Sequence, residues 1–387
     1  MYCLSHFRNQ RKRWPQKFFY YKLSIILFCI LFTTGVATFI LIKSGQGKDG
    51  YLYIHDGAIQ TELATKKLLA GKNFYTEDFS DTVLAHWNED SNPTYFLGER
   101  VDNSIVVQHY AYLPVYPILS IPFYLVTKNV FHFYDERLVF YVAFLGALWL
   151  LYKLVKGREE KLLALTLFGF NPFFVKDLVE GKNDILILFF LLLIIYLLQK
   201  KKIVSASIIL GVAVMAKQTI WPLLPFYFFY LFFQQKDWRE SVFYIWQKTK
   251  WGIFVGLLIL LPFLFWDARS FWQDIYQYMN GTLATSYPIN GFGWSRLIYR
   301  LGLVDSIHDY YPFYIGQIIF CLPLLWWLIK KQAKNNTVSF MLLGYTALLF
   351  TFWFFSRFFQ SNYIVFLYQL LVITYFISYN EATNEAA

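Results

Sequence analysis

The run "YYKLSIILFCILFTTGVATFILI" at residues 20–42 decides the fold class, because it is a long and almost uninterrupted apolar stretch. An α-helix needs about 20 such residues to cross the hydrocarbon core of a bilayer. The stretch before it, "RNQRKRWPQK", is strongly basic, and no small-residue cleavage site follows the run. We therefore expect a retained first transmembrane helix, with the basic side in the cytoplasm.

The composition extends this expectation to the whole chain of 387 residues. The chain is 57% hydrophobic and 22% aromatic, with a mean hydropathy of +0.39, whereas soluble domains are usually less than half apolar. A transmembrane β-barrel would show ten-residue alternation instead of apolar runs near span length. The sequence predicts an all-α, polytopic transmembrane helical bundle that forms a single domain over residues 1–387.

The net charge of +10 does not indicate nucleic-acid binding here. The lysines and arginines form short clusters between apolar runs, as expected for cytoplasmic anchors under the positive-inside rule. The three cysteines, Cys3, Cys29 and Cys321, include no pair in a predicted external loop. The sequence therefore predicts neither a disulfide framework nor a metal site with cysteine spacing.

Ordering the apolar runs by their charged flanks gives about ten crossings. The predicted spans are 20–42, 138–154, 162–178, 185–198, 203–216, 220–233, 251–266, 312–329, 338–355 and 363–378. This order places every longer basic cluster on the cytoplasmic side, together with a basic leader at 1–19. It leaves two large external loops, at residues 44–108 and 267–310.

Two segments of the external side need separate treatment. Residues 110–126, "YAYLPVYPILSIPFYLV", are apolar but contain three prolines, and counting them as a span would invert every later loop. We expect a re-entrant or interfacial element, the alternative being a real crossing with an unrecognised short return. Residues 56–71, "DGAIQTELATKKLLAG", have the spacing of an amphipathic helix. The simplest expectation is that this helix lies on the membrane surface.

With this topology, polar side chains converge on the outer face. An interfacial carboxylate can remove a proton from an acceptor hydroxyl, and lysine or arginine can hold a phosphate and stabilise its charge as a leaving group. The arrangement suits group transfer from a lipid-linked phosphate donor. The candidate residues are Asp56, His109, Tyr110, Asn183, Asp184, Lys217, Gln218, Arg296, Arg357 and Asn362.

Each candidate also has a simpler interpretation. An aspartate after a span, such as Asp56, is more often a helix-end or solvent residue. Asp184 could cap the next helix, His109 could be an interfacial hydrogen-bonding residue, and Lys217 could extend to the headgroups. Arg357 is harder to dismiss, because it lies between aromatic apolar runs at an outer boundary, where a partner is expected.

Taken together, five segments resemble the GT-C superfamily of integral-membrane glycosyltransferases, and within it the bacterial polytopic mannosyltransferase-like branch. The resemblance covers most of the chain. In that branch a "G-x-N-D" helix start is followed by "G-x-A-x-x-x-K" and a "W-P" step. The segments are "IHDGAIQTELATKKLLAGKNFY", "YAYLPVYPILSIPFYLV", "NPFFVKDLVEGKNDILILFFLLLIIYLL", "ILGVAVMAKQTIWPLLPFY" and "SRFFQSNYIVFLY".

The resemblance implies roles for particular residues. Asp56 resembles the general base of the family, and Lys217 and Arg357 resemble basic positions near the donor phosphate. Asn183 and Asp184 match a family motif and, with the remaining candidates, are expected to shape the site. The "HDG" at Asp56 lacks the Asp-x-Asp pair of metal-dependent members, so no metal ligand is assigned and no cofactor is certain. A divalent metal is possible but is not indicated.

The resemblance also implies the reaction. A mannose-like hexose or related sugar would move from a polyprenyl-phosphate donor to a hydroxyl of a lipid or glycan acceptor, with inversion, at the outer face of the cytoplasmic membrane. A transporter or flippase of lipid-linked sugars is the alternative; it predicts ionisable groups at mid-bilayer and repeated halves, and the sequence has few of the former and no repeat. A structural or assembly protein of the cell envelope is a third possibility, in which the outer polar residues would tolerate alanine.

Overall fold

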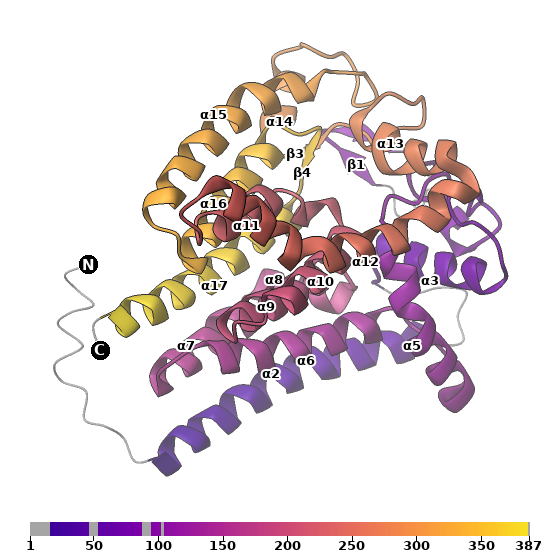
Figure 1. Ribbon diagram of the computed structural model, residues 1–387. Helices are drawn as coiled ribbons and strands as arrows, with labels where there is room; N and C mark the ends of the chain where they lie inside the picture. Colours follow the sequence, from indigo (N-terminus) through magenta and orange to yellow (C-terminus); the bar gives the residue numbers. More distant parts are fainter. Residues whose placement is uncertain (1–15, 46–52, 87–93, 102–103, 386–387) are drawn as a thin grey trace.

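The computed structural model describes residues 16–45, 53–86, 94–101 and 104–385 (Figure 1). Most of the predicted basic leader lies outside these residues, as do Cys3 and parts of the predicted first external loop. The longer helices are α2 (Gln16–Gly45), α3 (Asp56–Leu69), α5 (Val115–Phe131), α6 (Arg137–Leu154), α7 (Arg158–Gly169), α8 (Pro172–Glu180), α9 (Asp184–Gln199), α10 (Ile203–Val214), α11 (Leu223–Phe232), α12 (Trp238–Trp272), α15 (Phe313–Lys334), α16 (Val338–Phe354) and α17 (Ser361–Glu385).

The membrane helices confirm the predicted fold class. Among the described residues, α2, α6, α12, α15 and α17 are long and apolar enough to cross a bilayer. Helices α7 and α8 meet the same test only as a pair, bent by 56°. The shorter apolar helices α9, α10, α11 and α16 coincide with the remaining predicted spans. The protein is an all-α, polytopic helical bundle.

Helix α9 forms the centre of the bundle because it is apolar on every side. Its sequence, "DILILFFLLLIIYLLQ", has no polar face after the first residue, and such a helix is stable only when it is surrounded. It packs between α6 and α10 (Figure 1). By contrast α2, α12 and α15 expose most of their apolar side chains, as expected for helices solvated by lipid tails.

Helices α10 and α12 cross at glycines. A Cβ atom on Gly211 would overlap the carbonyl of Gly252, and one on Gly252 would overlap the carbonyl of Ser207. Small residues at a membrane-helix crossing let the two backbones approach closely. This contact fixes α10, and therefore Lys217 just beyond its end.

We expect Gly252→Ala to lower the free energy of unfolding by about 1–3 kcal/mol, because the added methyl group must push α10 and α12 apart. Gly256→Ala is the matched control, since its Cβ would lie 3.6 Å from the nearest atom, the Gly211 oxygen. Thermal unfolding of both purified variants, followed by tryptophan fluorescence, checks this. Equal stability of the two variants would contradict the close crossing.

Helix α12 marks the boundary between the membrane bundle and an outer layer. It is broken at Asp267, whose backbone is extended (φ −161°, ψ 96°). Asp267 Oδ1 accepts a hydrogen bond from the Ser270 N–H (3.0 Å), which caps a new helical segment. The break falls where the late external loop is predicted to begin.

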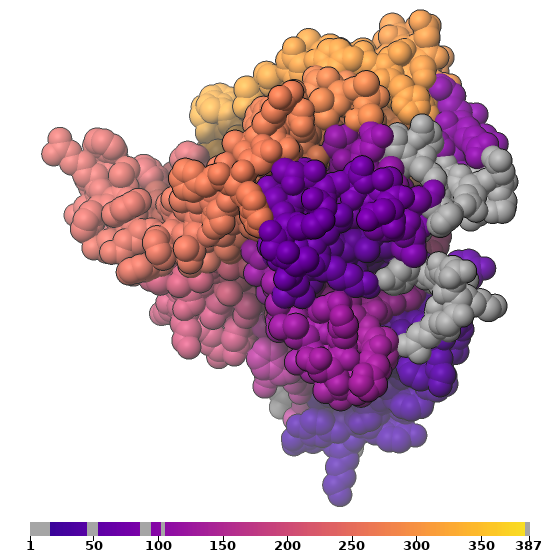
Figure 2. Space-filling view, turned by 90° about the vertical axis from the view of Figure 1, so that its right-hand side faces the viewer, coloured from indigo at the N-terminus to yellow at the C-terminus, as the bar shows by residue number. Residues whose placement is uncertain are grey.

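The outer layer is built from short elements that join the two predicted external loops. These elements are η1 (Val83–His86), β1 (Tyr95–Phe96), β2 (Glu99–Arg100), α4 (Ser104–Val107), η2 (Gln218–Ile220), η3 (Gln273–Gln277), α13 (Tyr278–Asn280), β3 (Asn290–Gly291), α14 (Trp294–Arg300) and β4 (Phe358–Phe359). Tyr75 packs edge-on against Phe271, with ring centroids 5.0 Å apart. Figure 2 shows the purple surface of the first loop directly beside the orange surface of the late loop.

Helix α3 departs from the prediction. Eight of its first ten residues are buried, including the polar residues Gln60, Thr61, Glu62 and Thr65. Gln60 Nε2 donates to the carbonyls of Val106 (2.8 Å) and His109 (3.1 Å). The polar face of α3 is therefore buried against protein instead of facing water, and its position at the membrane surface stays a prediction.

The proline-containing segment becomes α5, which starts after Pro114 and packs on α3 and α6. It is not among the described helices that are long and apolar enough to span. One face is buried, including Tyr116 and Ser120, and the opposite face exposes Ile118 and Leu125. This distribution suits an element with protein on one side and lipid on the other, so partial insertion stays a prediction.

Candidate functional site

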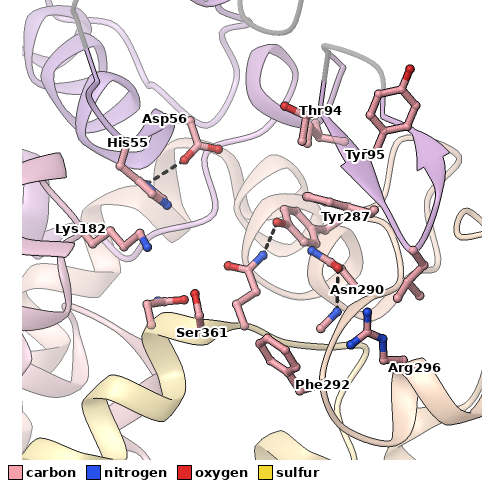
Figure 3. A pocket seen from close by; sticks show the side chains of 16 residues that line it. His55, Asp56, Thr94, Tyr95, Lys182, Tyr287, Asn290, Phe292, Arg296 and Ser361 are labelled. Carbon is pink, nitrogen blue, oxygen red and sulfur yellow. Dashed lines mark hydrogen bonds and ion pairs between the residues drawn. The ribbon is translucent and has the colours of Figure 1, made fainter. Parts of the chain in front are cut away.

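A cavity of about 480 Å³ lies in the outer layer. It is bounded by the start of α3, the β1–β2 hairpin, the turn before α9, the segment from Tyr287 to Arg296 and the start of α17. Its volume is in the range of small-molecule sites, about 300–1,000 Å³. Figure 3 shows Asp56 and Lys182 reaching into it from one side, with Phe292 and Arg296 on the other.

The parallel pair β3–β4 brings two of these walls together. Asn290 pairs with Phe358 and Gly291 with Phe359. Gly291 has φ 106°, and a Cβ there would overlap the backbone of Phe359. Only glycine suits this position, and the pairing places the residues that begin α17 beside Asn290.

Asp56 is the first residue of α3 and lines the cavity with 26% of its side chain exposed. Its Oδ1 accepts from the Gly57 N–H (2.7 Å) and lies 2.8 Å from His55 Nδ1. Burial raises the pKa of Asp56, but His55, the Gly57 N–H and the charge of Lys182 outweigh burial and hold it below its usual range. The side chain is therefore a carboxylate at neutral pH.

Lys182 also lines the cavity, and the sequence analysis did not select it. It follows Gly181, whose φ of 82° makes the sharp turn between α8 and α9. Its Nζ lies 2.6 Å from Asp177 Oδ1 and 3.8 Å from Glu180 Oε2. The motif "GKND" was the available signal, but sequence does not reveal which side chain of a turn faces outward.

One hydrogen-bonded network next to the cavity joins Asn183, Asp184, Lys217 and Asn362. Lys217 Nζ donates to Asn183 Oδ1 (2.8 Å) and Asp184 Oδ1 (2.5 Å). Asn362 Nδ2 donates to Asp184 Oδ2 (2.7 Å). Of the four, Asn362 lines the cavity. Lys217 therefore neutralises a buried carboxylate and ties α9, the end of α10 and α17 together.

Arg357 is 2% exposed and does not line the cavity. Its guanidinium donates to the carbonyls of Tyr287 (2.5 Å), Asp309 (2.8 Å) and Ile307 (3.2 Å). Burial lowers the pKa of Arg357 to about 10, so it stays charged at neutral pH. It joins the start of the last loop to two parts of the late loop.

The late loop is contacted by His109 and Tyr110 at the end of the first loop and by Gln218 in η2. His109 Nδ1 lies 2.7 Å from Asp274 Oδ1, and its Nε2 lies 2.7 Å from Thr285 Oγ1. The N–H of the buried Tyr110 donates to Asp274 Oδ2 (2.9 Å). Gln218 Nε2 contacts the Ile275 carbonyl at 3.5 Å. None of these three residues lines the cavity, so their site-shaping role stays a prediction.

Arg296 is the candidate that lines the far side of the cavity. Its guanidinium carbon lies 5.8 Å from the centre of the Phe292 ring. Beside it, Gln360 Nε2 donates to the Tyr287 hydroxyl (2.5 Å), and both side chains line the cavity. Sequence reasoning did not select Tyr287, because it lies in a loop without a repeating pattern.

Within the described residues, no three side chains of His, Cys, Asp or Glu are grouped as metal ligands would be. A comparison with curated proteins gave no match. A comparison with protein families matched residues 110–353, more than half of the chain, to Glycosyltransferase family 87. The matched range includes Lys182, Lys217 and Arg296. It does not include Asp56 or Arg357. The chain therefore belongs to glycosyltransferase family 87 and is a membrane glycosyltransferase of the GT-C type.

Proposed function

We propose that the protein transfers a mannose-like hexose or related sugar from a polyprenyl-phosphate donor to a hydroxyl of a lipid or glycan acceptor, with inversion. The observation that carries this proposal is that the Asp56 carboxylate and the Lys182 ammonium group line one cavity. One group can accept a proton and the other can bind a phosphate. These are the two requirements of an inverting transfer from a sugar phosphate.

In the proposed reaction the acceptor oxygen attacks the anomeric carbon of the donor sugar. The new carbon–oxygen bond forms as the bond to the phosphate oxygen breaks, and its electron pair leaves with the prenyl phosphate. Asp56 takes the proton of the acceptor hydroxyl. Lys182 stabilises the charge on the departing phosphate. Lys217 and Arg357 support the site by holding Asp184 and the late loop, instead of contacting the phosphate.

The proposed donor path leads from the membrane to Lys182. Lys182 and Asn362 also line a narrow crevice between α8, α9 and α17. The deeper walls of this crevice are apolar, with Leu188, Val365 and Phe366 among them. The crevice has a volume of only about 10 Å³, so α8, α9 and α17 must move apart to admit a prenyl chain. We expect the apolar chain against the apolar walls and the charged phosphate at Lys182.

We propose further that the cavity faces outward from the cytoplasmic membrane and that the N-terminus is cytoplasmic. Helices α6 and α9 begin in the layer that holds the cavity and run away from it (Figure 1). They end at Lys153–Lys161 and at Lys200–Lys202, two of the basic clusters that the positive-inside rule places in the cytoplasm.

The protein reconstituted in liposomes, supplied with labelled polyprenyl-phosphate hexoses and with envelope lipid and glycan fractions, tests the activity. The proposal expects label in a new glycosidic product. Label that crosses the bilayer on its prenyl carrier with no new glycosidic bond would instead favour the flippase. The hexose that reacts identifies the donor.

Lys182→Met should raise the donor concentration at half-maximal rate at least about tenfold, because a charge-assisted contact to phosphate is lost. Lys176→Met is the matched control, since Lys176 lies on α8 nearby but has a side chain that is 66% exposed. Initial rates of transfer at varied donor concentration check the expectation. Equal effects of the two changes would remove Lys182 from the donor site.

A further inference from the structure

The β1–β2 hairpin forms the outer wall of the cavity. The residues of this segment that line the cavity are Thr94, Tyr95, Phe96 and Leu97. Each strand has only two residues, and the turn between them has positive φ at Leu97 (50°) and Gly98 (100°). An isolated two-stranded hairpin is marginally stable in water even when it is longer. The position of this wall must therefore come from contacts with other parts of the protein.

Glu99 supplies such contacts to segments about 200 residues away in sequence. Its Oε1 accepts hydrogen bonds from the Tyr299 hydroxyl (2.8 Å) and from the Ile307 N–H (3.1 Å). Its Oε2 accepts one from the Ser306 hydroxyl (2.9 Å). Three donors thus converge on one carboxylate, from the end of α14 and from the segment that follows it. Hydrogen bonds to an ionised acceptor are about twice as strong as those between neutral groups.

A second contact of the wall, between two aromatic rings, is less directional. The Phe96 ring lies 5.8 Å from the Tyr287 ring, in a tilted arrangement. Such a contact holds the two rings near each other. It does not fix the orientation of a small hairpin in the way that three convergent hydrogen bonds do.

We propose that Glu99 is a positioning residue that holds the hairpin closed over the cavity, and that the closed wall limits access of water to the reacting sugar. This proposal rests on the proposed function. When the wall opens, water replaces the acceptor hydroxyl: its oxygen bonds to the anomeric carbon, the phosphate leaves with its electron pair, and Asp56 takes a proton of the water. The products are free sugar and prenyl phosphate. Glu99 therefore determines the ratio of transfer to hydrolysis.

The first measurement needs no substrate. Hydrogen exchange of the full-length protein in nanodiscs should show the amides of residues 94–101 exchanging at least about tenfold faster in Glu99→Ala, because three charge-assisted bonds are lost. Glu99→Gln should restore most of the protection, since its amide can still bond to the same three groups. Glu77→Ala is the matched control, because Glu77 lies in the same external loop and pairs with Lys67 and Lys72 away from the cavity.

The second measurement is the ratio of free sugar to transferred sugar. Glu99→Ala should raise this ratio about tenfold, in step with the faster exchange, and Glu99→Gln should leave it close to the wild-type value. Tyr299→Phe removes a single donor and should give a smaller increase in both readouts. It also provides the test if Glu99→Ala does not fold.

The outcomes separate the two proposals. Unchanged exchange at residues 94–101 in Glu99→Ala and in Tyr299→Phe would overturn the role of Glu99. Faster exchange with an unchanged product ratio would overturn the role of the wall in excluding water. A wild-type protein that forms no glycosidic bond from any labelled donor would instead contradict the proposed function, and the exchange result would still report on the hairpin alone.

Discussion

Asp56→Asn is expected to lower the rate of sugar transfer by about 10²–10⁴-fold, which is the usual contribution of a positioned general base. The amide has nearly the shape of the carboxylate and can still contact the Gly57 N–H and His55, which hold Asp56 in place. The protein should therefore accumulate in the membrane and keep its thermal stability. The rate of transfer falls because the amide of asparagine cannot accept the proton of the acceptor hydroxyl.

Asp78→Asn is the matched control for this change. Asp78 lies in the same external loop and bonds only to Ser80 among the contacts resolved for its side chain, and it does not line the cavity. Initial rates with one labelled polyprenyl-phosphate donor compare the two variants. Transfer by Asp56→Asn at a rate near that of Asp78→Asn would exclude Asp56 as the base.

Arg357→Met is expected to lower the free energy of unfolding by at least about 3 kcal/mol and to abolish transfer. Methionine fills much of the space but leaves three buried carbonyls without their charged donor, those of Tyr287, Ile307 and Asp309. Hydrogen bonds to charged groups contribute about 1.5–3 kcal/mol each, although the three do not add independently. The cavity wall that carries Tyr287 should lose its position.

Arg300→Met provides the comparison, because Arg300 lies on the exposed side of α14. Thermal unfolding and hydrogen exchange of residues 281–312 measure the effect of each substitution. A stable Arg357→Met protein that has lost only donor affinity would show that Arg357 contacts the phosphate, as the family resemblance implies, and that its three carbonyl contacts are incidental.

The membrane bundle was predictable because lipid imposes a simple requirement on sequence. Each span must satisfy its own backbone hydrogen bonds and present apolar side chains, so its length and hydropathy are visible in the chain. Every predicted run falls on helical residues, from 20–42 in α2 to 363–378 in α17, although only five of the described helices are by themselves long and apolar enough to span. The pair α7–α8 is predicted as one run, and its break follows from Pro172, which starts a new helix after the Asn171 cap.

The outer layer was less predictable because its contacts join distant segments without a repeating pattern. The period of α3 indicates a helix, but not that Gln60 would bond to the carbonyls of Val106 and His109. Hydropathy therefore assigned its polar face to water. Only the packing of η1, α4 and α5 around α3 reveals that this face is buried.

The candidate residues divide in the same way. Asp56, Arg296 and Asn362 were selected because the predicted topology places them on the outer face, and the structure brings all three to one cavity. Lys217 and Arg357 were selected as cations at the same boundary, but their partners within the protein are Asp184 and three backbone carbonyls. Charge is visible in a sequence, whereas the partner that satisfies it is not.

The most direct test of the central claim is a cryo-electron microscopy structure of the protein with a polyprenyl phosphate bound. We expect the phosphate within hydrogen-bond distance of Lys182 Nζ and the prenyl chain leaving between α8 and α17. A phosphate bound away from Lys182, either in place of Asp184 on Lys217 or at the basic cytoplasmic ends of the helices, would contradict the account.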